Sequence, residues 1–510
     1  MEFKSKIEYL FIAVLIGFGV YLMYLASGTQ MLGEDEAVYY SLAQSFTNLQ
    51  YPSFDSLGRP ENFPVFVSLI YSAFFSIFGP SLFLAKAITA FFGLLTLLIV
   101  YVIGKKFSIY YGFLAAVILL SMTSFTHQNM IAYVEIPIAF FSALFAYFLL
   151  EFRPLEKNST IRAVIIGAIL GLAYYTKFSA LVLVLILFLH SFTFYYFSKN
   201  KKYLKLFLMS IVAFVVMISP FLVRNLYYFQ YPFFEGLNLF FKQPAYFADV
   251  NPKWLIDAIS QLSPVNTSIQ TYSATFGWVA LALGLFGLGW LVGNYKVDIN
   301  KTRYLFSLSL VATVFILIFN WFFIIGYTVI EPRYLSIIFP QVALLGGFFL
   351  WQTQEKSKYL LPIVLIIIFF GLFNSVGIAQ ATNSAQRYPN DYLDALKWIK
   401  TNTDSSDIIF TAYGGSLQQF SNRQNLWIIK EFPDLMRSQN STLIYQTLKD
   451  YNVSYILIWQ GILAQDYIIP QSNLLGAFTV NFLNVVSQDT QHFVPVYSNS
   501  ANVIYRLNSS

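Results

Sequence analysis

Long apolar runs alternate with short polar segments over the first 380 residues of the chain. A helix needs about 17–25 predominantly apolar residues to cross the roughly 30 Å of hydrocarbon in a bilayer. The stretch 63–79 is at the lower limit of this length and ends at Gly79-Pro80, so its place depends on the topology. The remaining runs predict about 11 membrane spans, near residues 8–28, 82–103, 110–126, 135–151, 161–177, 179–197, 204–222, 276–293, 304–328, 334–351 and 359–378.

The basic residues of the linking segments indicate the orientation. They concentrate before the first span and in every second loop after it, which is the pattern of cytoplasmic loops. A full crossing by 63–79 would move every later loop to the opposite side, so we predict an interfacial or re-entrant helix there. The clustered residues are Lys4, Lys6, Lys105, Lys106, Arg153, Lys157, Arg162, Lys199, Lys201, Lys202, Lys205, Lys296, Lys301, Arg303, Lys356 and Lys358.

This topology predicts a multi-pass protein of the plasma membrane, with a cytoplasmic N-terminus and an extracytoplasmic C-terminal region. The first apolar run, 8–28, has no convincing small-residue cleavage site, so we expect it to remain as a span.

The pattern changes after about residue 380, where short helix-like and strand-like segments alternate. Residues 391–400 and 441–450 have the apolar spacing of helices, and residues 408–410 and 453–459 are typical of strands. We therefore predict a polytopic α-helical membrane protein with a C-terminal extracytoplasmic α/β domain. The expected parts are a transmembrane domain at 1–380, with a first outer loop at 29–81 and a long outer loop at 223–275, and an α/β domain at 381–510.

Composition supports a lipid-embedded body. The chain is 57% hydrophobic and 11% charged, whereas soluble globular proteins carry about 25% charged residues, so an ordinary soluble enzyme is excluded. The chain has no Cys, which excludes disulfides and thiolate metal sites. Its three His residues lie far apart and do not indicate a His-rich metal site. Because the basic residues gather in the cytoplasmic loops, the net charge of +6 does not point to a nucleic-acid partner.

Carboxylates gather near the predicted outer ends of the spans. Glu34, Asp35 and Glu36 are consecutive in the first outer loop, Glu61 precedes the interfacial helix, and Glu135 begins the fourth span. Charges close to lipid are costly unless they face water, a cation or a substrate. A solvated acidic loop, and a favourable helix N-terminal charge at Glu135, are the simpler alternatives.

Three cations lie on the same predicted side. Lys177 is in a tight turn between two spans, and Arg224 and Arg333 lie at span ends. Each one alone is typical of an interface anchor whose apolar stem lies along the membrane. Carboxylates supply a general base or metal ligands, and Arg and Lys neutralise phosphate. Taken together, the two sets indicate a site for an anionic substrate.

Ordered motifs contain most of these residues. They are Gly33-Glu34-Asp35-Glu36-Ala37-Val38-Tyr39-Tyr40, Glu61, Glu135-Ile136-Pro137, Gly171-Leu172-Ala173-Tyr174-Tyr175-Thr176-Lys177, Pro220 with Arg224-Asn225, and Pro332-Arg333-Tyr334-Leu335 with Pro340. Their order over residues 1–350 resembles the C-type membrane glycosyltransferases that use polyprenyl-phosphate sugars. The likeness is to the protein mannosyltransferase group, glycosyltransferase family 39, and to the lipid A aminoarabinose transferases.

The resemblance implies a C-type glycosyltransferase fold and an enzyme. It would transfer one sugar from a dolichyl- or undecaprenyl-phosphate donor, at the outer face and with inversion, to a hydroxyl of a protein, lipid or glycan. Membrane lipids are the other expected partners.

The expected roles of the residues follow from the same resemblance. Asp35 and Glu36 are the expected catalytic carboxylates, with Asp35 as the base. A divalent metal (Mg, Mn or Zn) is a possible cofactor, with Asp35 and Glu135 as its candidate ligands. The expected phosphate-binding residues are Lys177, Arg224 and Arg333, and those expected to position the acceptor or a metal are Glu34, Glu61 and Glu135.

The motifs depart from this group in three places. Glu135 stands where the family often has Asp, and Asn62 stands where the aminoarabinose enzymes tend to have Lys. The Trp-Trp-Asp signature of the related oligosaccharyltransferases does not occur, which argues against oligosaccharide transfer to Asn. The alternative function is a multi-span transporter or lipid flippase that uses outer-face carboxylates. Against it, the charges lie at span ends rather than at the midplane, and no inverted repeat is evident.

Overall fold

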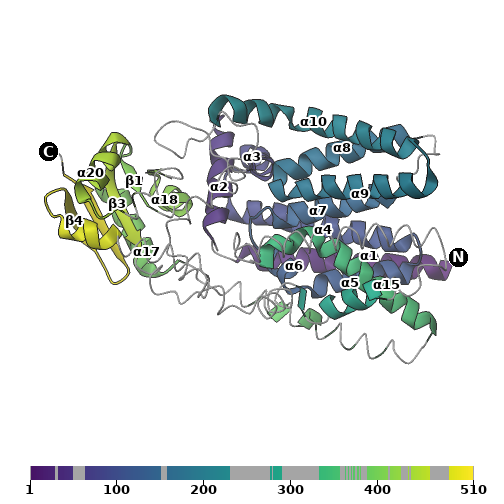
Figure 1. Cartoon of the computed structure of the whole chain (residues 1–510). Helices are drawn as coiled ribbons and strands as arrows, with labels where there is room; N and C mark the ends of the chain where they lie inside the picture. The colour runs from purple at the N-terminus through teal and green to yellow at the C-terminus, as the bar shows by residue number, and fades with distance from the viewer. Residues whose placement is uncertain are drawn as a thin grey trace, which may run out of the picture.

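The computed structural model shows a bundle of long helices and a small domain built around a sheet (Figure 1). Isolated residues between 362 and 380, and residue 435, are also described. The continuous ranges that the structure describes are 2–28, 33–49, 64–150, 158–229, 276–277, 280–289, 332–356, 388–411, 414–426, 438–459 and 482–508.

The bundle confirms the prediction of a multi-pass membrane protein. Within the described residues, 6 helices are long and apolar enough to cross a membrane. The expected span at 304–328 lies outside the described residues, and only isolated residues of 359–378 are described. The bundle helices are α1 (Glu2–Ser27), α4 (Leu82–Lys105), α5 (Ile109–Ser121), α6 (Thr123–Gln128), α7 (Glu135–Leu150), α8 (Ser159–Thr176), α9 (Leu181–Ser198), α10 (Lys202–Phe229) and α15 (Phe339–Lys356), with a further helix at Ala280–Gly289.

Two expected spans are interrupted. The one at 110–126 breaks at Met122, whose extended backbone separates α5 from α6. The one at 334–351 begins with the 3-10 helix η2 (Pro332–Ile338), and α15 starts only at Phe339. The ring of Pro340 would clash with the carbonyl four residues earlier in an α-helix, so a regular helix cannot run through this point unchanged.

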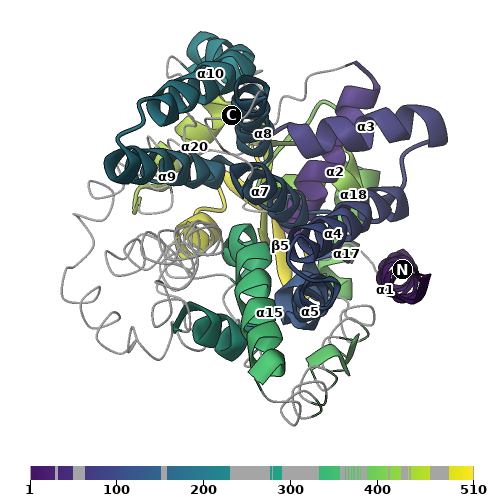
Figure 2. The ribbon, with the colours of Figure 1, turned by 90° about the vertical axis from the view of Figure 1, so that its right-hand side faces the viewer.

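The first outer loop contains two short helices, α2 (Glu34–Thr47) and α3 (Phe66–Phe78). In Figure 2, α3 is seen from the side whereas α1 and α7 are seen end-on, so α3 lies across the bundle. Its 13 residues extend about 20 Å, too short to cross the hydrocarbon layer. The hydroxyl of Ser68 donates to the carbonyl of Tyr39 at 3.0 Å and joins α3 to α2. This arrangement agrees with the predicted interfacial helix.

The two ends of the bundle differ in character. The N-terminus and the loop between α9 and α10 lie at one end, and the sheet domain lies beyond the other (Figure 1). An ion pair between Glu8 and Lys105 joins the start of α1 to the end of α4 at the former end. We call this the basic end, because it carries Lys199–Lys205, and we call the opposite one the tail end. The charge pattern also places the N-terminus and the C-terminal region on opposite sides, and which end faces the cytoplasm stays a prediction.

Small residues let α8 and α10 approach closely. A Cβ atom on Gly167 would lie 2.2 Å from the backbone oxygen of Ser210, and one on Gly171, one turn further along, would lie 2.5 Å from Cβ of Met217. The hydroxyl of Ser210 donates to the carbonyl of Ala163 at 2.8 Å. Small residues at four-residue spacing allow this close packing of membrane helices. The contact holds α8 and α10 against each other.

The C-terminal domain is α/β, as predicted. Its sheet has the order β2-β1-β3-β5-β4, with β1 parallel to β2 and β3, and β5 antiparallel to β3 and β4. The helices and strands expected at 391–400, 408–410, 441–450 and 453–459 are present. The elements are α17 (Asn390–Asn402), β1 (Ile408–Phe410), α18 (Gly414–Ser421), β2 (Gln424–Leu426), α20 (Ser441–Asp450), β3 (Val453–Trp459), β4 (Phe493–Ser498) and β5 (Asn502–Leu507).

Helix α18 packs against α2, so the C-terminal domain docks on the first outer loop (Figure 1). Leu417 of α18 is fully buried and belongs to the same apolar core as Ala37 and Leu42 of α2. The expected boundary near residue 380 lies among residues that are not described, and the division into two domains stays a prediction.

We expect Gly167→Val to destabilise the protein strongly, because the added side chain meets backbone and α8 and α10 must separate. The midpoint temperature of thermal unfolding in detergent should fall by several degrees. The matched control is Gly17→Val in α1, where a Cβ atom meets nothing within 4 Å. Equal effects of the two substitutions would show that the close contact is not important.

Candidate active site

Three carboxylates at the tail end of the bundle each contact a cation from another element. The charged atoms are joined over short distances, and every pair links segments that are far apart in the sequence. The pairs are Arg333 Nη1 with Asp35 Oδ2 at 2.5 Å, Lys177 Nζ with Glu135 Oε1 at 2.9 Å, and Lys86 Nζ with Glu36 Oε1 at 3.4 Å.

The start of α2 separates two neighbouring carboxylates. Successive residues of a helix point about 100° apart, so Asp35 and Glu36 face different surroundings. Their charges are also favourable here, because the first turn of a helix carries unsatisfied N–H groups. The side chain of Asp35 is 33% exposed, whereas that of Glu36 is fully buried.

Glu36 forms a buried ion pair with Lys86 of α4. Both side chains are 0% exposed, and Glu36 Oε1 also accepts the N–H of Ala132 at 2.8 Å. Removing one member of such a pair leaves an uncompensated buried charge. The pair therefore holds the start of α2 on the bundle, which favours a structural role for Glu36 over the catalytic one expected above. Lys86 is not among the residues predicted from the sequence, although a lone charge within an apolar span is a signal for a partner.

Glu135 is the first residue of α7, and Pro137 lies in the same first turn, a position that suits Pro. Lys177, the partner of Glu135, follows the last turn of α8 and has an extended backbone conformation. The side chain of Glu135 is 3% exposed and that of Lys177 is 18% exposed. The second carboxylate oxygen, Oε2, is buried and has no hydrogen-bond partner within the described part of the chain.

Arg333 reaches Asp35 from the 3-10 helix η2. Its guanidinium lies 5.3 Å from the centre of the Tyr133 ring, a cation–π geometry that orients it. Arg333 is 19% exposed. Exposure of the carboxylates thus rises from Glu36 through Glu135 to Asp35, and Asp35 is the most accessible of the three.

Tyr39 interacts electrostatically with members of both of the more exposed ion pairs. Burial, together with the negative charges of Asp35 and Glu135, raises the pKa of Tyr39 well above its usual range, and Arg333 opposes this only in part. The phenol therefore stays neutral and does not add an anion. We call Asp35, Arg333, Glu135, Lys177 and Tyr39 the charged cluster.

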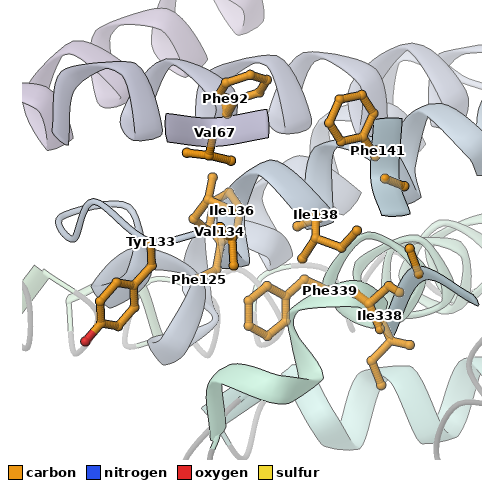
Figure 3. Close-up of a cluster of buried hydrophobic side chains, with 14 of the residues drawn as sticks. Val67, Phe92, Phe125, Tyr133, Val134, Ile136, Ile138, Phe141, Ile338 and Phe339 are labelled. Carbon is orange, nitrogen blue, oxygen red and sulfur yellow. The ribbon is translucent and has the colours of Figure 1, made fainter. Parts of the chain in front are cut away.

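An apolar cluster supports the elements that carry these charges (Figure 3). The ring centres of Phe125 and Phe339 lie 6.1 Å apart in an edge-to-face arrangement, and those of Phe92 and Phe141 lie 6.5 Å apart. The cluster includes Ile136, which follows Glu135 directly. Because protein interiors are close-packed, these contacts hold α4, α6, α7 and the start of α15, which follows η2 directly, in one arrangement.

The other predicted residues have different surroundings. Arg224 lies on α10, its guanidinium 4.3 Å from the centre of the Phe221 ring and its Nε donating to Asn225 Oδ1 at 3.0 Å. Glu34 is the first residue of α2. Glu61 lies outside the described residues.

The expected metal site has no complete set of ligands among the described residues. No group of three or more His, Cys, Asp and Glu side chains gathers there. Asp35 and Glu135, the expected metal ligands, are each matched by a cation. The arrangement instead offers cations to an anion and one accessible carboxylate to a proton donor. The divalent metal stays a prediction.

Comparison with known proteins identifies the fold. Residues 62–223 match the family model described as dolichyl-phosphate-mannose-protein mannosyltransferase. No curated protein sequence matches the chain.

Solved structures match over nearly the whole chain. One is the Archaeoglobus fulgidus oligosaccharyltransferase AglB in complex with an inhibitory peptide and a dolichol-phosphate (14% identity, TM-score 0.67, 100% of this chain and 75% of that chain). The same archaeal enzyme in complex with Zn and sulfate is also similar (15%, TM-score 0.66, 98% and 73%). A third is ArnT from Cupriavidus metallidurans bound to undecaprenyl phosphate (12%, TM-score 0.52, 98% and 98%).

These matches confirm the predicted fold class and the predicted resemblance to C-type membrane glycosyltransferases. The match to the family model bears out the prediction of a glycosyltransferase.

We expect Glu36→Gln to destabilise the protein by about 3–5 kcal/mol, because it leaves Lys86 buried without its counter-charge. The loss of stability is measured by the thermal unfolding temperature and by the yield of monodisperse protein. The double variant Glu36→Leu/Lys86→Met should regain much of the loss, since it removes both charges. A double variant as unstable as Glu36→Gln would contradict the structural role of the pair.

Proposed function

We propose that the protein transfers a single sugar from a polyprenyl-phosphate donor to an acceptor hydroxyl. The observation that carries the proposal is the order of burial among the ion pairs, which leaves Asp35 and Arg333 accessible at the tail end. The dolichol-phosphate and undecaprenyl phosphate bound by the two similar folds support a lipid-phosphate donor.

Asp35 is the proposed general base. It takes the proton of the acceptor hydroxyl, whose oxygen then attacks the anomeric carbon opposite the phosphate. The bond between that carbon and the phosphate oxygen breaks, and its electron pair leaves with the polyprenyl phosphate. Attack from the opposite face inverts the configuration. A phosphate is a good leaving group, so this route needs no acid catalyst.

Arg333 and Lys177 stabilise the charge that develops on the departing phosphate. Arg333 offers a planar set of N–H donors that matches phosphate oxygens. A phosphate that takes over Arg333 would release Asp35 from its ion pair, so donor binding would free the base. Arg224, at the tail end of α10, is the third proposed phosphate contact.

Glu135, with Glu34 and Glu61, is proposed to position the acceptor. The support for Glu135 is its buried Oε2, which has no hydrogen-bond partner among described residues and is suited to accept a hydroxyl group.

The tail end is the proposed outer face of the plasma membrane. Asp35 and the C-terminal domain share this end through the packing of α18 on α2, and the basic end carries the clustered lysines typical of cytoplasmic loops. The acceptor is a protein, lipid or glycan on that face.

A transporter or flippase is the second candidate. The ion pairs of Asp35, Glu36 and Glu135 lie at one end of the bundle, whereas transporter sites lie near the midplane, so this candidate has the weaker support.

We expect Asp35→Asn to lower transfer by about 10²–10⁴-fold while the protein stays folded, because the base is lost and the shape is kept. Full-length protein in nanodiscs is incubated with short-chain polyprenyl-phosphate hexoses and pentoses, and release of polyprenyl phosphate is followed. Asp394→Asn, at an exposed position of α17, is the control. Turnover that persists in Asp35→Asn would overturn the base assignment.

We expect Arg333→Gln to weaken binding of a fluorescent polyprenyl phosphate by about 10–100-fold, as for loss of one charge-assisted contact. Arg162→Gln at the basic end is the matched charge control. Undiminished binding in Arg333→Gln would place the phosphate elsewhere.

A further inference from the structure

A groove of about 850 Å³ opens on the surface of the bundle between α8 and α10. It lies toward the basic end, because it includes the first turns of α10 and Val164, in the first two turns of α8. Lys177 of the charged cluster follows the opposite end of α8, and Arg224 lies near the opposite end of α10. The groove is therefore separate from the candidate active site.

The walls of the groove are almost entirely apolar. Val164 and Ala168 contribute from α8, and Leu208, Val212 and Val216 contribute from α10. The valines and Leu208 are exposed, which in a membrane-spanning pair of helices means that they face lipid. Ala168 has a small side chain, so the groove is open at a position of α8 where a larger side chain would fill it.

The polar groups of the groove gather at one end. Lys201 and Lys205 lie four residues apart at the start of α10, so they share a face. Tyr195, from the last turn of α9, stands beside them. No carboxylate of the described residues lies within ion-pair distance of either lysine. Lys199 and Lys202, in the same loop region, do not line the groove.

We propose that this groove binds an anionic phospholipid of the leaflet at the basic end. The lipid phosphate contacts Lys201 and Lys205, and an acyl chain lies along α8 and α10. Basic pockets between membrane helices on the cytoplasmic side bind anionic headgroups in this way. From Lys201 to Met217, which also lines the groove, α10 rises about 24 Å, more than the roughly 15 Å depth of one leaflet.

The bound lipid contacts both helices whose close packing depends on Gly167. It therefore stabilises the α8–α10 pair, which carries Lys177 and Arg224 at its other end. This role does not depend on which sugar, if any, the protein transfers.

Lipid retention tests the proposal on the full-length protein. The protein is reconstituted with equal amounts of phosphatidylglycerol, phosphatidylcholine and diacylglycerol, extracted into detergent, and examined by native mass spectrometry. We expect retained phosphatidylglycerol to exceed each of the other two by about tenfold. Equal retention of the three lipids by the unmodified protein would by itself overturn the proposal. Excess inorganic phosphate should not displace the lipid, and displacement would show a simple anion site.

Paired variants locate the site. Lys201→Gln/Lys205→Gln should lose about tenfold in retained phosphatidylglycerol, whereas Lys199→Gln/Lys202→Gln, which removes the same charge from the same region, should not. Val212→Trp fills the groove and should also lower retention, in contrast to Val215→Trp on the same helix outside the groove. Equal losses within either pair of variants would show a general basic or apolar surface and contradict the proposal.

Discussion

The buried ion pair between Glu36 and Lys86 is the constraint on which the arrangement of the charged cluster depends. Burying these two charges costs desolvation free energy, and the pair lies where the first outer loop meets the bundle. Because helix geometry turns Asp35 away from Glu36, fixing one residue in the interior presents the other to the surface. The carboxylate of Glu36 also accepts the N–H of Ala132, so it holds the segment that leads into α7 and Glu135.

Burial separates three similar carboxylates into different tasks. Glu36 is enclosed with its cation and is suited to holding structure, whereas Glu135 is nearly buried beside a partly exposed Lys177. Asp35 is accessible, and its partner Arg333 is the type of side chain that phosphate oxygens prefer. A site in which an arriving anion exchanges with a carboxylate gives both charge neutralisation and a free base.

The sequence predicted the fold class, and it singled out Asp35, Glu135, Lys177 and Arg333, which the structure brings into ion pairs. It did not predict which of these residues, far apart in the chain, contact each other. Apolar run lengths predicted the described spans, and short apolar runs predicted β1 and β3. Asp35 and Arg333 lie far apart in the sequence, and no local sequence pattern indicates that they pair. Lys86 does have a local signal, because it is a charge within an apolar span. The break before Pro340 follows from local chemistry, whereas the docking of α18 on α2 depends on tertiary contacts that spacing does not encode.

The most direct test of the account is a cryo-EM structure of the protein in nanodiscs with a bound polyprenyl phosphate. The account predicts the phosphate between Arg333 and Lys177, with Asp35 more than 4 Å, the usual limit of an ion pair, from the guanidinium of Arg333. A phosphate bound away from both cations, with the pair of Asp35 and Arg333 intact, would contradict it.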